Sequence, residues 1–70
     1  MKLTIESTPH TTAIDGVPVR VWNGTSEFGV PCKIFVHRIA VALEEDQAQF
    51  DLELLSKLEP GRFIDLRHIL

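Results

Sequence analysis

The chain has little of what stabilises other small proteins. It contains a single cysteine, Cys32, which leaves no partner for a disulfide within the chain. Its three histidines (His10, His37 and His68) lie too far apart in the sequence for the close spacings of a structural zinc site. A chain of 70 residues buries only about 60% of the surface that it exposes when unfolded. Its stability therefore has to come from packing.

The chain also lacks an excess of positive charge and long apolar runs. Seven lysines and arginines stand against ten aspartates and glutamates, which gives a formal net charge of −3. Proteins that bind duplex DNA normally have a basic stripe, so we do not expect duplex DNA as a partner. No run approaches the ~20 apolar residues of a membrane helix, and residues 1–10 lack the apolar stretch of a signal peptide. We therefore expect a cytoplasmic protein with no membrane partner.

A high apolar content for its length is what the chain does have. Hydrophobic residues make up 44% of the sequence, and a chain this short is expected to leave some of them outside its core. That surplus favours self-association, most simply as a symmetric homo-oligomer. Residues 1–70 contain no repeat, low-complexity tract or linker, so we interpret them as a single domain.

The first third of the chain has the alternation of apolar and polar residues that is typical of β-strands. A first strand is predicted over Lys2–Ser7, and Thr8-Pro9 is expected to end it because proline donates no hydrogen bond to a sheet. Asp15-Gly16 separates two further strand-like runs, Thr11–Ile14 and Val17–Trp22. This pair predicts a two-residue hairpin turn with positive φ at both positions.

The next segment predicts a loop followed by the longest strand. Asn23–Gly29 is rich in turn residues, with Asn23-Gly24 and Gly29 as the expected positive-φ positions. Val30–Leu43 is apolar on both faces over part of its length, which is typical of a strand covered on both sides. The alternation slips at His37-Arg38, where we expect a bulge.

The last third predicts a helix and a final strand. Acidic residues 44–46 suit the first turn of a helix, and Pro60-Gly61 suits its end. Arg62–Leu70 is expected to form the final strand. The chain is therefore predicted to be an α+β protein in the order β-β-β-β-α-β, with an antiparallel sheet of four to five strands and the helix packed on one face. The apolar positions with helical spacing are Ala48, Phe50, Leu52, Leu54, Leu55 and Leu58.

No arrangement of residues in the sequence favours catalysis. Cys32 and His37 are expected on opposite faces of one strand, and a core position explains Cys32 more simply than a nucleophile. Carboxylates 44–46 fit a solvated helix N-terminus better than an acid/base pair. If the final strand lies beside the long strand, His37 and His68 approach one another and a symmetry mate could complete a metal site, but exposed or core histidines are the simpler interpretation. We therefore expect no enzyme, no metal and no cofactor.

Arg20 and Trp22 are the strongest candidates for a binding site. They share the face of the second hairpin strand opposite its three valines, and arginine and tryptophan dominate binding hot spots. Two interpretations stay open: Trp22 fills a core or subunit interface while Arg20 pairs with an acid, or both contact a ligand or partner. Phe28, in the loop, is expected either to fold back as a lid on the core or to contact a partner. The expected binding residues are Arg20, Trp22, Phe28, Lys33, Arg38 and Arg67.

Six segments of the chain together form a distinctive pattern. They are Ile14-Asp15-Gly16, Arg20-Val21-Trp22, Gly29-Val30, Arg38–Val41, Asp46–Leu54 and Leu66–Leu70. The pattern is an Ile-Asp-Gly turn, Arg-Val-Trp, a Gly-Val pair, an Arg-Ile-Ala-Val strand end, a helix with Gln-Phe and Glu-Leu, and a Leu-Arg-x-Ile-Leu finish. In this pattern the chain resembles a family of small proteins encoded in tailed-phage and prophage genomes of proteobacteria. It departs from the family pattern at Asn23, where the family has an acid.

This resemblance implies a context for the function. Small phage-encoded proteins in the bacterial cytoplasm commonly act by binding. We therefore expect a non-enzymatic accessory protein that counteracts a host process, plausibly a defence system. It would either sequester a small anionic ligand such as a signalling nucleotide or block a host protein. The alternative is a structural or assembly protein of the virion.

Overall fold

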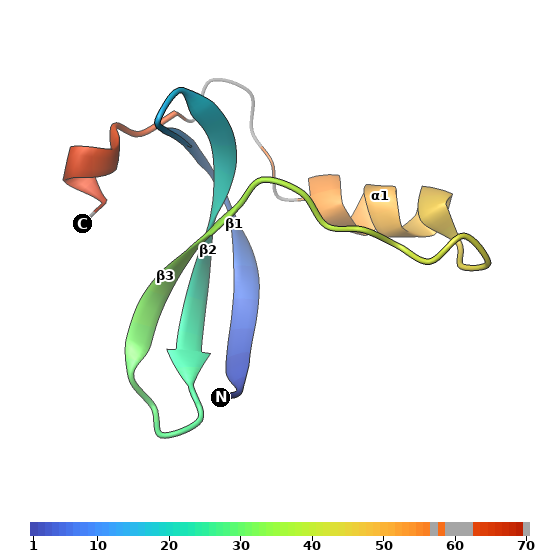
Figure 1. Ribbon diagram of the computed structural model, residues 1–70, viewed down its shortest axis with the longest axis horizontal. Coiled ribbons are helices and arrows are strands. Elements are labelled where there is room, and N and C mark those ends of the chain that lie inside the picture. The colour runs from blue at the N-terminus through green and yellow to red at the C-terminus, as the bar shows by residue number, and fades with distance from the viewer. Residues whose placement is uncertain (57, 59–62, 70) are drawn as a thin grey trace.

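The computed structural model describes residues 1–56, 58 and 63–69. This part of the chain forms a small α+β fold with three strands, one α-helix and one 3₁₀ helix (Figure 1). The strands form one antiparallel sheet in the order β1-β2-β3. The expected α+β class is confirmed, but the described residues form three strands instead of four to five. The elements are β1 (Leu3–Ile14), β2 (Val17–Ser26), β3 (Pro31–Val36), α1 (Gln47–Leu55) and η1 (Leu66–His68).

β1 joins the first two expected strands into one. It continues through Thr8-Pro9, and its register with β2 shifts between Ser7 and Thr11. Proline is tolerated at such an irregularity because the ladder is already interrupted there. The Thr8 hydroxyl holds the shift in place, since it donates to Val21 O at 2.6 Å and accepts from His10 N at 3.2 Å. The prediction that Pro9 ends a strand was wrong.

The hairpin between β1 and β2 is as predicted, with positive φ at Asp15 (50°) and Gly16 (78°). The predicted turn at Asn23-Gly24 is wrong, because β2 runs through both residues. Gly24 is needed for a close approach instead: a Cβ there would lie 2.1 Å from Ile34 Cδ1. The third expected positive-φ position, Gly29, has φ 86°.

β3 is shorter than predicted and contains no bulge at His37-Arg38. It ends at Val36, and residues 37–46 form an irregular connection to the helix. His37 Nδ1 lies 2.9 Å from Pro18 O beyond the end of the strand. The apolar residues from Ile39 to Leu43 therefore belong to this connection, and the prediction of a strand to Leu43 was wrong.

α1 does not lie along a face of the sheet. Asp46 caps its N-terminus by accepting from Gln49 N at 2.9 Å, so residues 44 and 45 precede the helix. No residue of α1 is buried, and Figure 1 shows it projecting away from the sheet. The helix meets the sheet near its C-terminal end, so the prediction that it packs on one face was wrong. The expected helix end at Pro60-Gly61 lies outside the described residues.

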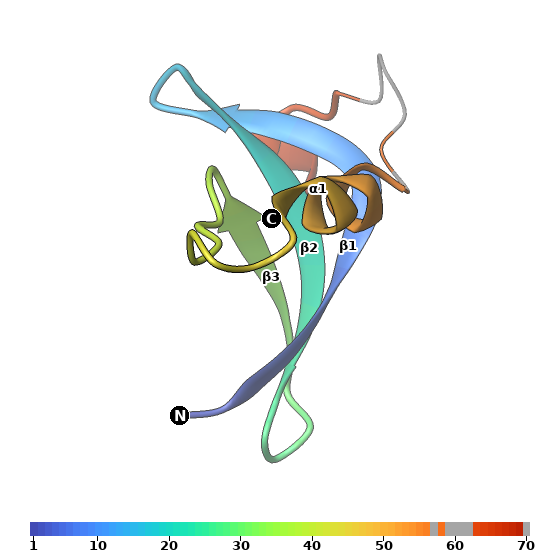
Figure 2. The ribbon, with the colours of Figure 1, turned by 90° about the vertical axis from the view of Figure 1, so that its right-hand side faces the viewer.

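The C-terminal segment covers the face of the sheet opposite α1 (Figure 2). The predicted final strand is wrong for the described part: Phe63 makes an isolated parallel bridge to Thr11, and a 3₁₀ helix follows at Leu66–His68. Ile64 N donates to Thr11 O at 2.8 Å. The small core lies under this segment on what we call the valine face, the face of the sheet with Val17, Val19 and Val21. Its most buried side chains are Thr12 (1% exposed), Val21 (3%) and Val19 (8%).

Candidate functional site

Arg20 links three parts of the fold. It lies in the middle of β2, between Thr11 of β1 and Val36 of β3, and is 9% exposed. Its Nε donates to Thr8 O at 2.9 Å, and its Nη1 donates to Leu54 O near the C-terminal end of α1. A cation is favourable at that end of a helix because the carbonyl dipoles point toward it. Burial lowers the pKa of Arg20. The guanidinium therefore holds α1 against the sheet.

Trp22 lies beside Arg20, as the alternation predicted. The Arg20 Cζ is 5.9 Å from the centroid of the indole ring, within the range of a cation–π contact. Trp22 is half-buried, and among the described residues neither its Nε1 nor Arg20 Nη2 has a hydrogen-bond partner. Both residues and Arg38 line a cavity of about 160 Å³ at the base of α1. Pockets for small molecules are typically larger, roughly 300–1,000 Å³.

Below Trp22, the same face of the sheet is largely uncovered. Gly24 pairs with Ile5 on one side and Cys32 on the other, and Ile34 Cδ1, Cys32 Sγ and Ile5 Cγ2 crowd the space above its Cα. Residues paired across antiparallel strands point to the same side. Leu3 and Ile5 are 44% and 41% exposed. We call this surface the open face; it consists of Leu3, Ile5, Trp22, Cys32 and Ile34.

The open face meets the helix at an angle. We call residues 37–55, which comprise the connection and α1, the arm. A shallow pocket of about 310 Å³ lies where the arm meets the sheet, lined by Trp22, Ile39, Phe50, Glu53 and Leu54. On the side of α1 opposite Phe50, Glu53 and Leu54, the side chains of Leu52 and Leu55 are 68% and 56% exposed. The molecule therefore presents two apolar surfaces at an angle to one another.

The other predicted binding residues lie apart from Arg20, Trp22 and Arg38. Phe28 is 92% exposed at the turn between β2 and β3, so the interpretation as a lid was wrong. Lys33 is exposed on the valine-face side, and its Nζ donates to Asn23 Oδ1. Arg67 pairs with Asp65 at 3.1 Å, which lowers the pKa of that carboxyl. The six predicted residues therefore do not form one site.

A second cavity lies on the valine face beneath the C-terminal segment. Its volume is about 400 Å³. Lys33, His10 and His68 are among the residues that line it, and His10 Nδ1 is buried with no partner among the described residues. Sequence reasoning missed His10, because the cavity exists only when the C-terminal segment folds over β2. We call it the valine-face cavity; its walls are Thr8, Pro9, His10, Val21, Asn23, Lys33, Ile64, His68 and Ile69.

Three further observations bear on function. Among the described residues, no group of three or more His, Cys, Asp or Glu side chains is placed to hold a metal ion. No helix in this part of the chain is long and apolar enough to cross a membrane. Comparison of the chain with protein-family models, curated proteins and solved structures finds no match.

Proposed function

We propose that the protein is a non-enzymatic binding protein that sequesters a small anionic ligand, of the nucleotide class, in the valine-face cavity. The observation that carries this proposal is the composition of the cavity wall. Among the described residues that line it are Lys33 and two histidines, and none of these lining residues has a carboxylate side chain. A lysine ammonium attracts phosphate oxygens, and a neutral or charged imidazole donates a hydrogen bond to them.

The size and walls of the cavity suit such a ligand. Its volume of about 400 Å³ is within the range of small-molecule sites, which combine apolar walls with few polar groups. Val21, Ile64 and Ile69 supply apolar wall for a base or sugar, and Lys33 and the histidines supply polar groups for the phosphate. Together with the resemblance to phage proteins, this supports a role in counteracting a nucleotide-dependent host defence in the bacterial cytoplasm.

Native mass spectrometry of gently purified protein, followed by calorimetric titration with nucleoside monophosphates and cyclic dinucleotides, tests this proposal. Lys33→Ala removes one charge-assisted hydrogen bond and is expected to raise the Kd at least about tenfold. Lys2→Ala removes an exposed lysine far from the cavity and is the matched control. The proposal fails when no nucleotide mass is retained and no nucleotide in the panel binds.

The turn between β2 and β3 supports a second candidate, direct blocking of a host protein. Gly29 N donates to Ser26 O and Ser26 N donates to Val30 O, both at 3.0 Å, so the turn is well fixed. It presents Phe28 and Val30, which are 92% and 61% exposed. Exposed aromatic side chains are common anchors of protein interfaces.

Phe28→Ala separates the two candidates. Under direct blocking, this substitution abolishes interference with the host and leaves nucleotide binding unchanged. Under sequestration, interference is unchanged by Phe28→Ala and lost with Lys33→Ala. A structural role in the virion predicts a third result, abundant protein in purified particles.

A further inference from the structure

The molecule exposes more surface than a globular protein of its mass. A monomer of 7.9 kDa is expected to expose about 4,400 Å², whereas this chain exposes 5591 Å². The excess is about 1,200 Å². A stable interface of standard size buries about 800 Å² on each partner. The surface that this chain leaves uncovered is therefore large enough for one such interface.

Much of the apolar part of this surface lies on the open face and on the arm, where Leu52 and Leu55 are on the side of α1 opposite Phe50, Glu53 and Leu54. The open face contributes Leu3 and Ile5, and the arm contributes Ile39 (37% exposed), Leu52 and Leu55. A sheet face needs a second layer over it, and an apolar helix surface needs a sheet or another helix against it. The arm is therefore a suitable second layer for the open face, and the open face is a suitable surface for the arm to pack on.

The arm does not cover the open face of its own chain. Arg20 Nη1 donates to Leu54 O, and Trp22 and Ile39 line one pocket together with residues of the helix. This anchors the C-terminal end of α1 at the upper part of the sheet. From there the helix extends away from the strands, as Figures 1 and 2 show from two directions. The lower open face is thus left without a layer from its own chain.

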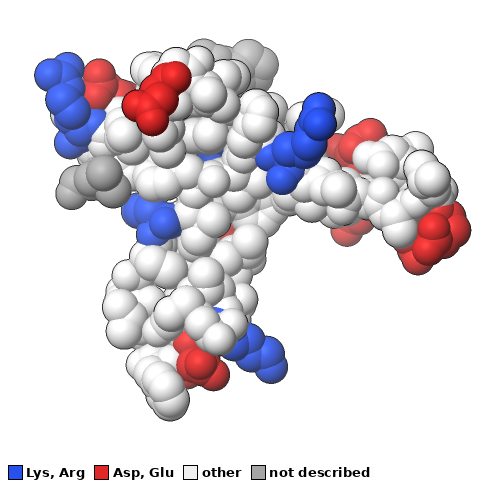
Figure 3. Space-filling view, in the orientation of Figure 1, with Lys and Arg blue, Asp and Glu red and all other residues white. Residues whose placement is uncertain are grey.

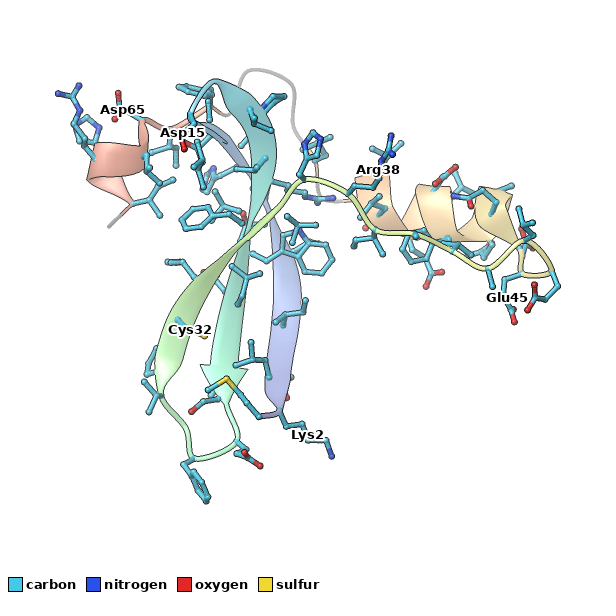
Figure 4. The ribbon with its side chains drawn as sticks, in the orientation of Figure 1. Lys2, Asp15, Cys32, Arg38, Glu45 and Asp65 are labelled. Carbon is cyan, nitrogen blue, oxygen red and sulfur yellow. The ribbon has the colours of Figure 1, made fainter. Side chains whose placement is uncertain are left out.

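Charge on the two surfaces is also complementary. Residues 44–53 of the arm include five carboxylates and no lysine or arginine, and Figure 3 shows acidic side chains over the arm. Lys2 lies at the free end of β1, next to Leu3 of the open face, and Glu45 lies at the far end of the arm (Figure 4). The outer end of the arm is therefore acidic, whereas the lower end of the open face carries Lys2 together with an acidic side chain (Figure 3).

We propose that two copies of this chain form a two-fold symmetric dimer in which the arm of each copy packs on the open face of the other. A two-fold interface uses the same patch on both copies. Here that patch consists of the projecting arm and the open face that would receive the arm of the other copy. In this arrangement the acidic end of each arm lies near Lys2 of the other copy. The dimer does not depend on the valine-face cavity, which lies on the opposite side of the sheet.

Light scattering coupled to size-exclusion chromatography gives the first test. The wild type is expected at twice 7.9 kDa, and Leu52→Glu/Leu55→Glu at the monomer mass. A hot-spot side chain contributes at least about 30-fold to the Kd, and each substitution occurs twice in a two-fold dimer. Val17→Glu is the matched control, because Val17 is 42% exposed on the opposite face; it is expected to stay dimeric. Circular dichroism checks that each variant is folded.

A crosslink tests the geometry even where the charged variants fail to fold. Cys32 is the only cysteine and lies on the open face. In Leu52→Cys, oxidised glutathione accepts the two electrons as a disulfide forms between the introduced cysteine and Cys32 of the partner subunit. Peptide mapping is expected to find this bond in a covalent dimer. Val17→Cys, on the opposite face, is expected to give no such bond.

Two results overturn the proposal. One is a wild-type monomer at tens of micromolar, alone or bound to a host protein through the arm. The other is a dimer that survives Leu52→Glu/Leu55→Glu with no crosslink from Leu52→Cys. Neither result bears on nucleotide binding, which the Lys33→Ala titration measures separately.

Discussion

The two faces of the sheet differ in how their burial is completed. The valine face is covered by its own C-terminal segment, and its central side chains are at most 8% exposed. On the open face, only the base of the arm is in contact, and Leu3 and Ile5 stay more than 40% exposed. Both faces come from the same three alternating strands. The difference teaches that alternation decides which side chains share a face, whereas distant segments decide whether that face is buried.

Replacement of Arg20 is expected to have the largest effect on stability, because Arg20 holds the base of the arm to the sheet. Arg20→Ala removes hydrogen bonds from a charged donor to Thr8 O and Leu54 O. Such bonds are each worth about 1.5–3 kcal/mol, so we expect the free energy of unfolding to fall by about 3 kcal/mol. Urea denaturation measures it, with exposed Arg38→Ala as control. A loss below 1 kcal/mol contradicts this role of Arg20.

A matched pair of substitutions compares the two faces directly. Val21→Ala leaves a cavity in the core and is expected to cost about 2 kcal/mol. Ile5→Ala removes more atoms, yet in dilute protein it is expected to cost less than about 0.5 kcal/mol because its side chain is exposed. Urea denaturation at low and high protein concentration measures both. If the dimer forms, the loss of unfolding free energy caused by Ile5→Ala grows with protein concentration. If both variants lose the same unfolding free energy in dilute protein, the two faces do not differ in burial.

The cap of α1 tests how far the arm forms without a layer over it. Asp46 accepts from Gln49 N, and replacing such a cap with alanine costs about 1 kcal/mol of helix stability. Short helices are marginal without packing, so Asp46→Ala is expected to reduce the helical circular dichroism signal. Asp46→Asn keeps an acceptor and is expected to retain the signal. Unchanged helicity in Asp46→Ala would mean that packing, and not the cap, maintains α1.

Local signals in the sequence predicted the hairpin and the shared face of Arg20 and Trp22 correctly. The Asp15-Gly16 turn depends on two adjacent residues, and the shared face depends on the period of one strand. The prediction that Pro9 ends a strand failed because the position of Pro9 in β1 depends on the hydrogen bond from the Thr8 hydroxyl to Val21 O, thirteen residues away. The prediction at Gly24 was wrong because glycine is required there for the close packing of Ile34 above its Cα, and not for a turn.

Local sequence signals could not predict the rest of the site. The residues after Phe63 alternate like a strand, yet they form a 3₁₀ helix capped by Asp65. Because this segment folds over β2, it brings His68 into one cavity with His10 and Lys33. No period or motif relates three residues from three separate elements. α1 was likewise predicted as a helix, but its direction depends on the bond from Arg20 to Leu54 O.

The smallest expected effect concerns the segment that covers the valine face. Arg67 hydrogen-bonds the Asp65 carboxyl and lowers its pKa from the usual 3.8. A depressed folded pKa contributes stability above the unfolded value, and this contribution is lost as the pH falls through the folded value. Because both side chains are exposed, acidification below pH 3.8 is expected to loosen η1 only slightly. NMR titration of the Asp65 carboxyl measures the shift. In Arg67→Ala it should return toward its usual value, while an unchanged titration would show that the ion pair does not form in solution.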